Sequence, residues 1–349
     1  IQQTTPYTIQ KLLPGEYSIK LTYPQHRDGF LAATVSSGIT GNYSKILTDT
    51  SVWVDFQTNN SGFVSNNLSC VAIDNFGYKW IGTLDKGLMK FDGLNVINFK
   101  KSNSGIPGDR IFTISIDILN RIWVGTNAGI GVYDGSSWTI YNNNNSGLMS
   151  NDITSIKFES ENVVWIGAYT GLYKLNGATW TRYNDFMNTI WVNDLEIDNG
   201  NIWAATNNGI VRLTNGIIEY FPDSIYNYPT NLVSSVEKDQ LNNIWFCHLN
   251  TSSARNGVSY YNGNIFTTYN PGTSLNAMNH ITIDEQNNKW IATNEGLFRF
   301  SSNNIQSVYS KANVPITSDK ISCTAIDEDG VLWITTFSNG LNKFKFSSK

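Results

Sequence analysis

A short pattern of apolar, small and polar residues recurs along the chain. In WVGTNAGIGVY, which starts at Trp123, an apolar run leads through a glycine-containing turn into a second apolar run. Each copy begins with a tryptophan, and successive tryptophans are 43, 42, 38, 42, 45 and 43 residues apart. A period this regular is typical of repeated supersecondary units. The tryptophans that begin the copies are Trp80, Trp123, Trp165, Trp203, Trp245, Trp290 and Trp333.

Each repeat contains four short runs with strand character. An apolar run such as CVAID at residues 70–74 passes through a polar turn into the tryptophan run, and a glycine, expected at positive φ, opens the third run. An Asp-Gly or Asn-Gly hairpin turn then leads to a fourth run with two aromatic residues, such as Trp138 and Tyr141. Four antiparallel strands per repeat form one blade of a β-propeller, so the sequence predicts an all-β fold. The tryptophans are expected to fill the gaps between blades.

The copy upstream of Trp80 is degenerate. FLAATVSSGITGNY places Phe30 where the other copies have tryptophan, 50 residues before Trp80. Residues 49–67 match the end of a blade and its exit loop, so we expect eight blades in a single domain spanning residues 1–349, with seven as the alternative. The last repeat stops after its third run. We therefore expect the N-terminal segment 1–10, through residues 7–10, to supply the missing outer strand and close the ring.

The composition agrees with a β-rich chain and excludes some partners. The 349 residues include 11 Trp, 17 Tyr and 17 Phe, which suit strands, and only 15% are charged. The 28 acidic and 24 basic residues are scattered singly, without the basic stripe that binding to nucleic acid requires. No apolar run approaches the roughly 18 residues of a membrane-spanning helix. The sequence begins without Met or a signal-like stretch, so we expect a processed form.

The common catalytic and metal-binding patterns are missing from the sequence. It contains no GxSxG, HExxH, P-loop or CxxC pattern. Cys70, Cys247 and Cys323 lie far apart in apolar runs and are expected to be buried free thiols. The acidic turn at residues 327–330 is interpreted as an Asx turn, because Ca²⁺ needs roughly six to eight oxygen ligands. We expect no cofactor, no metal and no enzymatic activity.

Two histidines are candidates for a metal-binding or acid/base site. His248 begins an unusually long loop, and His280 begins the inner strand of the next blade. Both are expected on the same face of the ring. They form either a weak metal or acid/base site, or ordinary polar contacts.

Connections that depart from the repeat indicate where a ligand would bind, since the shared residues pack the blades. Unusual connections at residues 184–194, 222–231, 248–255 and 310–320 bring aromatic and polar side chains to one rim, and the starts of the inner strands face the channel mouth. Aromatic rings beside Asn, Asp and Arg suit a sugar, although Tyr and Trp are also favoured in protein interfaces. The ligand-binding candidates are Trp191, Tyr226, Tyr228, His248, Arg255, His280, Asp152, Asn193, Asn231 and Arg110.

The pattern W-I-G-T-x-x-G-L-x-x-F, followed by an aromatic strand and an NSGL-x-S-N-x-I connection, resembles the two-component regulator propeller repeat. The resemblance is strongest from Trp80 to Phe346. It implies an extracytoplasmic protein of the gut Bacteroidetes type, periplasmic or lipid-anchored at the surface, that takes part in carbohydrate sensing and signal transduction.

On this basis we expect a monomeric, non-enzymatic propeller that binds an oligosaccharide and works with a separate signalling protein. A protein-interaction scaffold is the alternative. A metal-dependent lyase is the second alternative, because streptogramin lyases are seven-bladed propellers that use a histidine and a bound metal.

Overall fold

The structure is a computed structural model of the chain, and it describes residues 14–21, 29–35, 52–183, 190–249, 257–269, 277–301 and 306–345. The chain divides into two compact units, residues 1–52 and residues 53–349. The prediction of a single domain spanning residues 1–349 is therefore wrong.

The first unit contains a two-stranded antiparallel sheet of β1 (Gly15–Leu21) and β2 (Gly29–Val35). Phe30, which was expected to begin an additional copy of the repeat, lies in β2 opposite Lys20. This sheet has two strands where a blade has four. The repeat centred on Phe30 is consequently not a blade.

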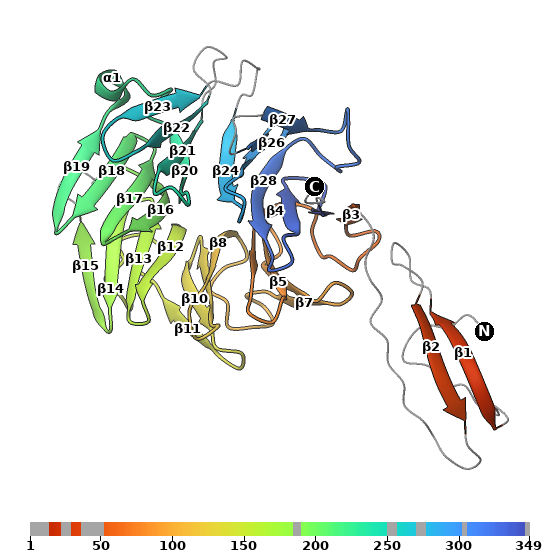
Figure 1. Cartoon of the computed structure of the whole chain (residues 1–349). Helices are drawn as coiled ribbons and strands as arrows, with labels where there is room; N and C mark the ends of the chain where they lie inside the picture. The colour runs from red at the N-terminus through yellow and green to blue at the C-terminus, as the bar shows by residue number, and fades with distance from the viewer. Residues whose placement is uncertain are drawn as a thin grey trace. The chain divides into compact units, whose positions relative to one another are not determined.

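The second unit is a β-propeller whose described residues form seven four-stranded antiparallel sheets (Figure 1). The prediction of an all-β propeller with four-stranded blades is confirmed, and the expected count of eight blades is wrong. In the first six blades the strands follow chain order from the inner to the outer edge. The first blade consists of β4 (Leu68–Ile73), β5 (Lys79–Thr83), β6 (Leu88–Phe91) and β7 (Val96–Phe99), and the second of β8 (Ile111–Ile116), β9 (Ile122–Thr126), β10 (Gly129–Tyr133) and β11 (Trp138–Tyr141). The third consists of β12 (Ile153–Ser160), β13 (Val163–Ala168), β14 (Gly171–Asn176) and β15 (Thr179–Tyr183), and the fourth of β16 (Val192–Asp198), β17 (Asn201–Thr206), β18 (Gly209–Thr214) and β19 (Ile217–Phe221). The fifth consists of β20 (Val233–Lys238), β21 (Ile244–His248), β22 (Val258–Tyr261) and β23 (Phe266–Tyr269), and the sixth of β24 (Met278–Ile283), β25 (Lys289–Thr293), β26 (Gly296–Phe300) and β27 (Gln306–Tyr309).

The seventh blade combines strands from both ends of the propeller. β28 (Ile321–Ile326), β29 (Leu332–Thr336) and β30 (Leu341–Phe344) take their fourth strand from β3 (Trp53–Phe56), which pairs antiparallel with β30. Trp53 stacks on Phe344 with ring centroids 4.2 Å apart. A ring closed in this way cannot open without breaking a sheet.

This closure corrects two expectations. Residues 7–10 do not supply the outer strand, because β3 occupies that place, and residues 7–10 lie outside the described part of the chain. Residues 49–67 do contain the end of a blade, as their sequence indicates. That blade is the last one of the ring, completed by a strand from the N-terminal side, rather than an eighth.

The repeated tryptophans pack between neighbouring blades, as predicted. All seven are at most 4% exposed, from Trp290 at 0% to Trp123 and Trp245 at 4%. Trp123 of the second blade, for example, shares a buried cluster with Ile156 and Tyr173 of the third blade. Large aromatic plates of this kind contribute much of the apolar burial in a core.

A carboxylate six residues before the tryptophan adds a polar contact to this packing. The indole Nε1 of Trp80 donates to Asp74 at 2.8 Å, and the same bond recurs in six of the seven blades. Trp203 differs: Ile197 stands six residues before it, and its Nε1 has no hydrogen-bond partner among the described residues. At residues 327–330 the corresponding Asp327 accepts the amide N–H of Asp329 at 3.2 Å, which confirms the Asx turn.

All seven inner strands share one irregularity. The register with the second strand shifts between the first and third residues of the inner strand. Positions along the seven inner strands therefore correspond one to one. The predicted positive φ of the glycines that open the third strands is also confirmed, as at Gly129, where φ is 112° and a Cβ would meet the carbonyl oxygen of Tyr141.

Candidate functional site

Five hydrogen bonds between neighbouring blades form a partial belt around one end of the central channel. In this belt, the second residue of an inner strand donates from its side chain to the backbone carbonyl of the first residue in the next inner strand. Asn193, a predicted ligand contact, is part of it and donates to the carbonyl of Val233 at 2.7 Å. The belt bonds run from Thr154 to Val192, from Asn193 to Val233, from Ser234 to Met278, from Asn279 to Ile321 and from Ser322 to Leu68.

The belt is interrupted in two neighbouring blades. In β4 the hydroxyl of Ser69 lies 3.6 Å from the Sγ of Cys70, and no belt bond joins it to β8 among the described contacts. In β8 the equivalent residue is Phe112, which has no donor in its side chain. Its ring centroid lies 6.2 Å from that of Tyr169, and the Tyr169 ring stacks on Trp191 at 4.7 Å with 15° between the ring planes. The guanidinium carbon of Arg110 lies 5.3 Å from the Phe112 centroid. We call Arg110, Phe112, Tyr169 and Trp191 the aromatic strip. Its members come from three successive blades.

Trp191 is 47% exposed, yet its ring is held by the stack on Tyr169 and its backbone by two hydrogen bonds. Its backbone N–H donates to the side chain of Asn207 at 2.8 Å, and its carbonyl accepts the N–H of Asn207 at 3.1 Å. The carbonyl of Asp152, another predicted contact, accepts the N–H of Tyr169 at 3.2 Å. An exposed ring that is already immobilised loses little freedom when a ligand binds.

Arg110 supplies the charge of the aromatic strip. Its side chain is exposed and has no ion-pair partner within the part of the chain that the structure describes. The predicted candidates Arg110 and Trp191 thus lie at the two ends of one continuous surface.

Three other candidates lie together around α1 (Asp223–Tyr226), away from the strip's ring contacts. Tyr226 is 36% exposed, and its ring packs edge-on against Phe221 with centroids 5.1 Å apart. Tyr228 is only 4% exposed, its hydroxyl donates to the carbonyl of Phe221, and burial raises the pKa of Tyr228. Asn231 donates to the Asp223 carboxylate at 2.8 Å. The prediction that Tyr228 lies on the surface is wrong.

His248 is fully buried, so the prediction that it lies on the rim is also wrong. It ends the second strand of its blade, where Thr293 stands in the next blade. Its Nδ1 lies 2.9 Å from the carbonyl oxygen of Thr230, and its Nε2 lies 2.7 Å from the hydroxyl of Ser259. Burial lowers the pKa of His248 to about 4, so the ring is neutral near pH 7. The candidate Arg255 lies outside the described residues.

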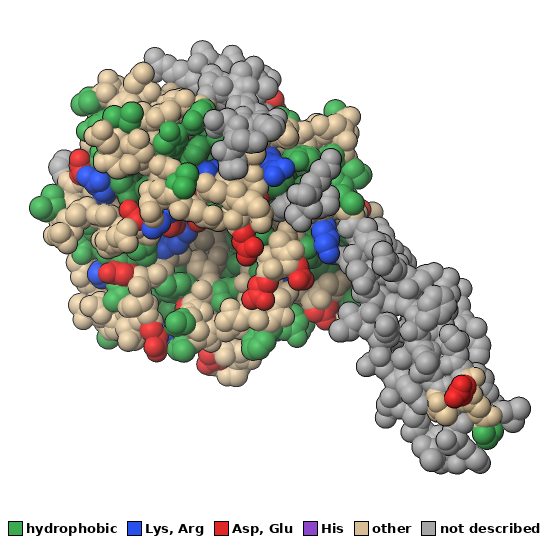
Figure 2. Space-filling view, in the orientation of Figure 1, with side chains coloured by type: hydrophobic (Ala, Val, Ile, Leu, Met, Phe, Trp, Pro, Cys, Tyr) green, Lys and Arg blue, Asp and Glu red, His purple; other side chains and the backbone are tan. Residues whose placement is uncertain are grey.

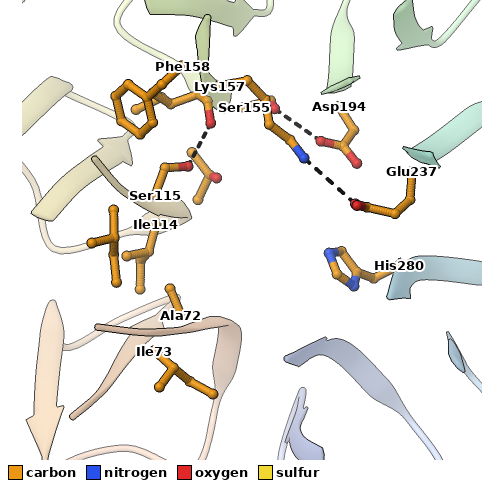
Figure 3. Close-up of a pocket in the computed structure, with 13 residues that line it drawn as sticks. Ala72, Ile73, Ile114, Ser115, Ser155, Lys157, Phe158, Asp194, Glu237 and His280 are labelled. Carbon is orange, nitrogen blue, oxygen red and sulfur yellow. Dashed lines mark hydrogen bonds and ion pairs between the residues drawn. The ribbon is translucent and has the colours of Figure 1, made fainter. Parts of the chain in front are cut away.

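Inside the channel the inner strands line a cavity of about 350 Å³. The face seen in Figure 2 is hollowed near its centre, and Figure 3 shows the side chains around this cavity. Asp194 accepts the hydroxyls of Ser155 at 3.0 Å and Ser235 at 2.8 Å, which ties three blades together. Its oxygens are therefore already used by the fold.

Lys157 and two glutamates form the charged side of the cavity. The Lys157 Nζ lies 2.9 Å from Glu196 and 3.7 Å from Glu237. Burial, together with the neighbouring Glu237 and Asp194 charges, raises the pKa of Glu196 to about 7 although Lys157 opposes the shift. Burial disfavours the charged form of Lys157, but the surrounding carboxylates raise its pKa above the usual range. The channel therefore holds excess negative charge.

His280 lines the same cavity (Figure 3), so His280 and His248 lie in different surroundings. Burial disfavours the charged form, but the thiolate of Cys323 and the charges of Asp194 and Glu237 raise the pKa of His280 to about 9. All three cysteines are buried and free, as predicted. Among the described residues, no group of three His, Cys, Asp or Glu side chains is arranged to hold a metal ion.

Sequence reasoning missed Phe112 and Tyr169, which join the aromatic strip into one surface. A signal for Phe112 was present: the corresponding position of the other inner strands holds Ser, Thr or Asn. Tyr169 had no comparable signal, because its role depends on a contact with a residue of the next blade.

Comparisons with known proteins bear on the fold. No protein-family model and no curated protein matches the chain. Among solved structures, the extracellular domain of the putative hybrid two-component system BT3049 from B. thetaiotaomicron has a TM-score of 0.71 and 20% identity, and the match covers 85% of this chain and 42% of that one. The corresponding domain of BT4673 has a TM-score of 0.67 and 19% identity over 85% and 40% of the two chains. Virginiamycin B lyase from Staphylococcus aureus has a TM-score of 0.70 and 14% identity over 84% and 99%.

The chain spans less than half the length of the two sensor-system domains. The only helix in the described residues, α1, has four residues, and none is long and apolar enough to cross a membrane. The resemblance found in the sequence is thus confirmed in the fold: this chain is similar to extracellular propeller domains of Bacteroides two-component systems and shares its architecture with a lyase as well.

Proposed function

We propose that the protein is an extracytoplasmic, non-enzymatic binding propeller of the sensor type, and that it binds an oligosaccharide on the aromatic strip. The observation that carries this proposal is the exposed, immobilised Trp191 ring stacked on Tyr169 at 4.7 Å. The similarity to extracellular domains of sensor systems supports the location and the sensor type.

The chemistry of the strip fits a sugar. The C–H face of a pyranose ring packs on an aromatic face, and hydroxyl groups accept or donate hydrogen bonds at its edges. Trp191 offers the open face, and Arg110 offers guanidinium donors at the other end of the strip. Phe112 stands at an inner-strand position that holds Ser, Thr or Asn in the other six blades and makes belt bonds in five of them, and such a departure is expected where selection acts for binding rather than for packing.

A protein-interaction scaffold would use the same exposed aromatic surface. A lyase resembling the streptogramin enzymes finds less support, since both ring nitrogens of His248 are engaged with Thr230 and Ser259 inside the protein. His280 faces the cavity in the channel rather than the rim.

Thermal unfolding in the presence of a panel of host and plant oligosaccharides tests the proposal. A glycan present at about 100 times its dissociation constant should add about 2.7 kcal/mol to the apparent stability. Trp191→Ala should weaken binding at least about tenfold, which corresponds to about 1.4 kcal/mol. Trp191→Phe should retain much of the binding, because it keeps an aromatic face.

Phe76→Ala is the matched control. Phe76 is 77% exposed, and it lies in the turn between β4 and β5, at the opposite end of the strands from the strip. Its loss should leave glycan binding unchanged. If no glycan shifts the unfolding transition of a cooperatively folded protein, the carbohydrate proposal fails, and a protein partner released by Trp191→Ala would favour the scaffold.

A further inference from the structure

Three side chains capable of nucleophilic or acid/base chemistry lie side by side in the channel wall, apart from the aromatic strip. Cys70 in β4, His280 in β24 and Cys323 in β28 each occupy the third position of their inner strand. β24 neighbours β28, and β28 neighbours β4 across the junction of the ring. Cys70 and Cys323 share one buried cluster.

Hydrogen bonds on both sides of this group fix the strands. Asn279, just before His280, donates to the carbonyl of Ile321 at 2.7 Å. Thr282, two residues after His280, donates to the carbonyl of Thr324 at 2.8 Å. These two bonds set β24 against β28 with His280 facing Cys323. A third bond, from Ser322 to the carbonyl of Leu68 at 2.8 Å, sets β28 against β4.

The charge distribution distinguishes Cys323 from the other two thiols. Burial works to raise the pKa of Cys323, but the charge of His280 and a hydrogen bond with its imidazole lower the pKa below the ordinary value. Burial and the neighbouring Cys323 raise the pKa of Cys70 to about 12, and burial raises the pKa of Cys247 further. The thiolate is the reactive form of cysteine, and a neighbouring imidazolium stabilises it.

Exposure separates Cys323 from Cys247 but not from Cys70. Cys323 is 7% exposed and Cys70 is 8% exposed, whereas Cys247 is 0% exposed. His280, the neighbour of Cys323 on the next inner strand, borders the 350 Å³ cavity. The groups that face this part of the cavity are Asp194 from β16 and Glu237 from β20, with Lys157 from β12. With Glu196, which pairs with Lys157, and the Cys323 thiolate, the negative groups outnumber the two cations Lys157 and His280, and this disfavours anionic molecules in the channel.

We propose that Cys323, held against His280 in the channel wall, is a modification site that reacts with small neutral or cationic electrophiles entering the central cavity. With an alkyl halide, the Cys323 sulfur forms a bond to the halide-bearing carbon, and the carbon–halogen bond breaks to release halide. His280 keeps its proton and neutralises the thiolate before the reaction. This site lies on the channel wall and is independent of the carbohydrate proposal.

Competitive alkylation of the folded protein tests the site, with iodoacetamide as the neutral probe and iodoacetate as its anionic counterpart. Mass spectrometry of the digested protein measures the rate at each cysteine at pH 7. Cys323 should react at least about tenfold faster than Cys70 and Cys247, because it has the larger thiolate fraction. Relative to free cysteine, Cys323 should also prefer iodoacetamide over iodoacetate.

His280→Asn should slow the alkylation of Cys323 about tenfold. Cys247→Ser should leave it unchanged, and Cys323→Ser should abolish the fast reaction. Near-UV circular dichroism confirms that each variant is folded. Labelling of the protein unfolded in guanidinium gives the alkylation rate of each cysteine in the absence of tertiary structure. Equal rates at the three cysteines of the folded protein, or a Cys323 rate that His280→Asn does not change, would overturn the proposal.

Discussion

The carboxylate that accepts the indole N–H of the repeated tryptophans should be a major source of stability. In the sixth blade, Asp284 accepts the Nε1 of Trp290 at 2.9 Å and the backbone N–H of Asn288 at 2.7 Å. Asp284, Asn288 and Trp290 are 4%, 3% and 0% exposed. Asp284 also accepts the side-chain amide Nδ2 of Asn288 at 2.7 Å. Asp284→Ala therefore leaves three buried donors without their acceptor.

Each buried donor left without an acceptor costs about 1–3 kcal/mol, so the three together should lower the free energy of unfolding by about 6 kcal/mol in Asp284→Ala. For a propeller of 297 residues, the unfolding entropy is about 0.6 kcal/mol/K, which converts this loss into a Tm decrease of about 10 °C. Guanidinium denaturation and calorimetry measure the two quantities. A loss below about 1 kcal/mol would refute the reasoning, because it would mean that the donors find other acceptors or water.

Trp203 provides the matched control for this prediction, since its Nε1 has no acceptor among the described residues. Both Trp203→Phe and Trp290→Phe remove the indole from a buried site. Only Trp290→Phe also breaks a hydrogen bond to a carboxylate, so it should cost about 1 kcal/mol more than Trp203→Phe. Equal losses would indicate that the indole–carboxylate bond contributes nothing net.

Two further predictions concern the buried histidine and the closure of the ring. The folded-state pKa of about 4 for His248 lies below its unfolded value of about 6.5, so the unfolded chain binds more protons between these values. The free energy of unfolding should therefore fall by about 3 kcal/mol as the pH drops from about 6.5 to 4. Denaturation curves across this pH range measure the dependence of the unfolding free energy on pH, and His248→Thr should remove this part of it. The same pH dependence in both proteins would contradict the prediction. Trp53→Ala, which removes the stacking on Phe344 in the closing blade, should lower the unfolding free energy by about 2 kcal/mol, more than Trp138→Ala in a blade made from one continuous segment. Urea denaturation compares the two, and an equal loss would show that closure adds no stability.

The aromatic strip shows which residues of the candidate site could be predicted from the sequence. Trp191 was predicted because it stands in an irregular connection, and Arg110 because it stands at the start of an inner strand; the structure places both in the aromatic strip. Tyr228 and His248 stand at equally irregular places, yet they point into the protein. An irregular residue is consistent either with a ligand contact or with a substitution that packs locally, and sequence alone does not distinguish the two.

The sequence by itself determined the blade and its repetition. The tryptophan period, the turn glycines and the alternation of apolar runs are local properties, and each blade of the first six is one continuous segment. The tertiary structure decided the number of blades, because β3 and β30 pair across nearly the whole propeller and no local pattern specifies that partner. It also decided which side chains meet in the aromatic strip and beside Cys323, since both groups combine residues from separate blades whose side chains are brought together only when the ring closes.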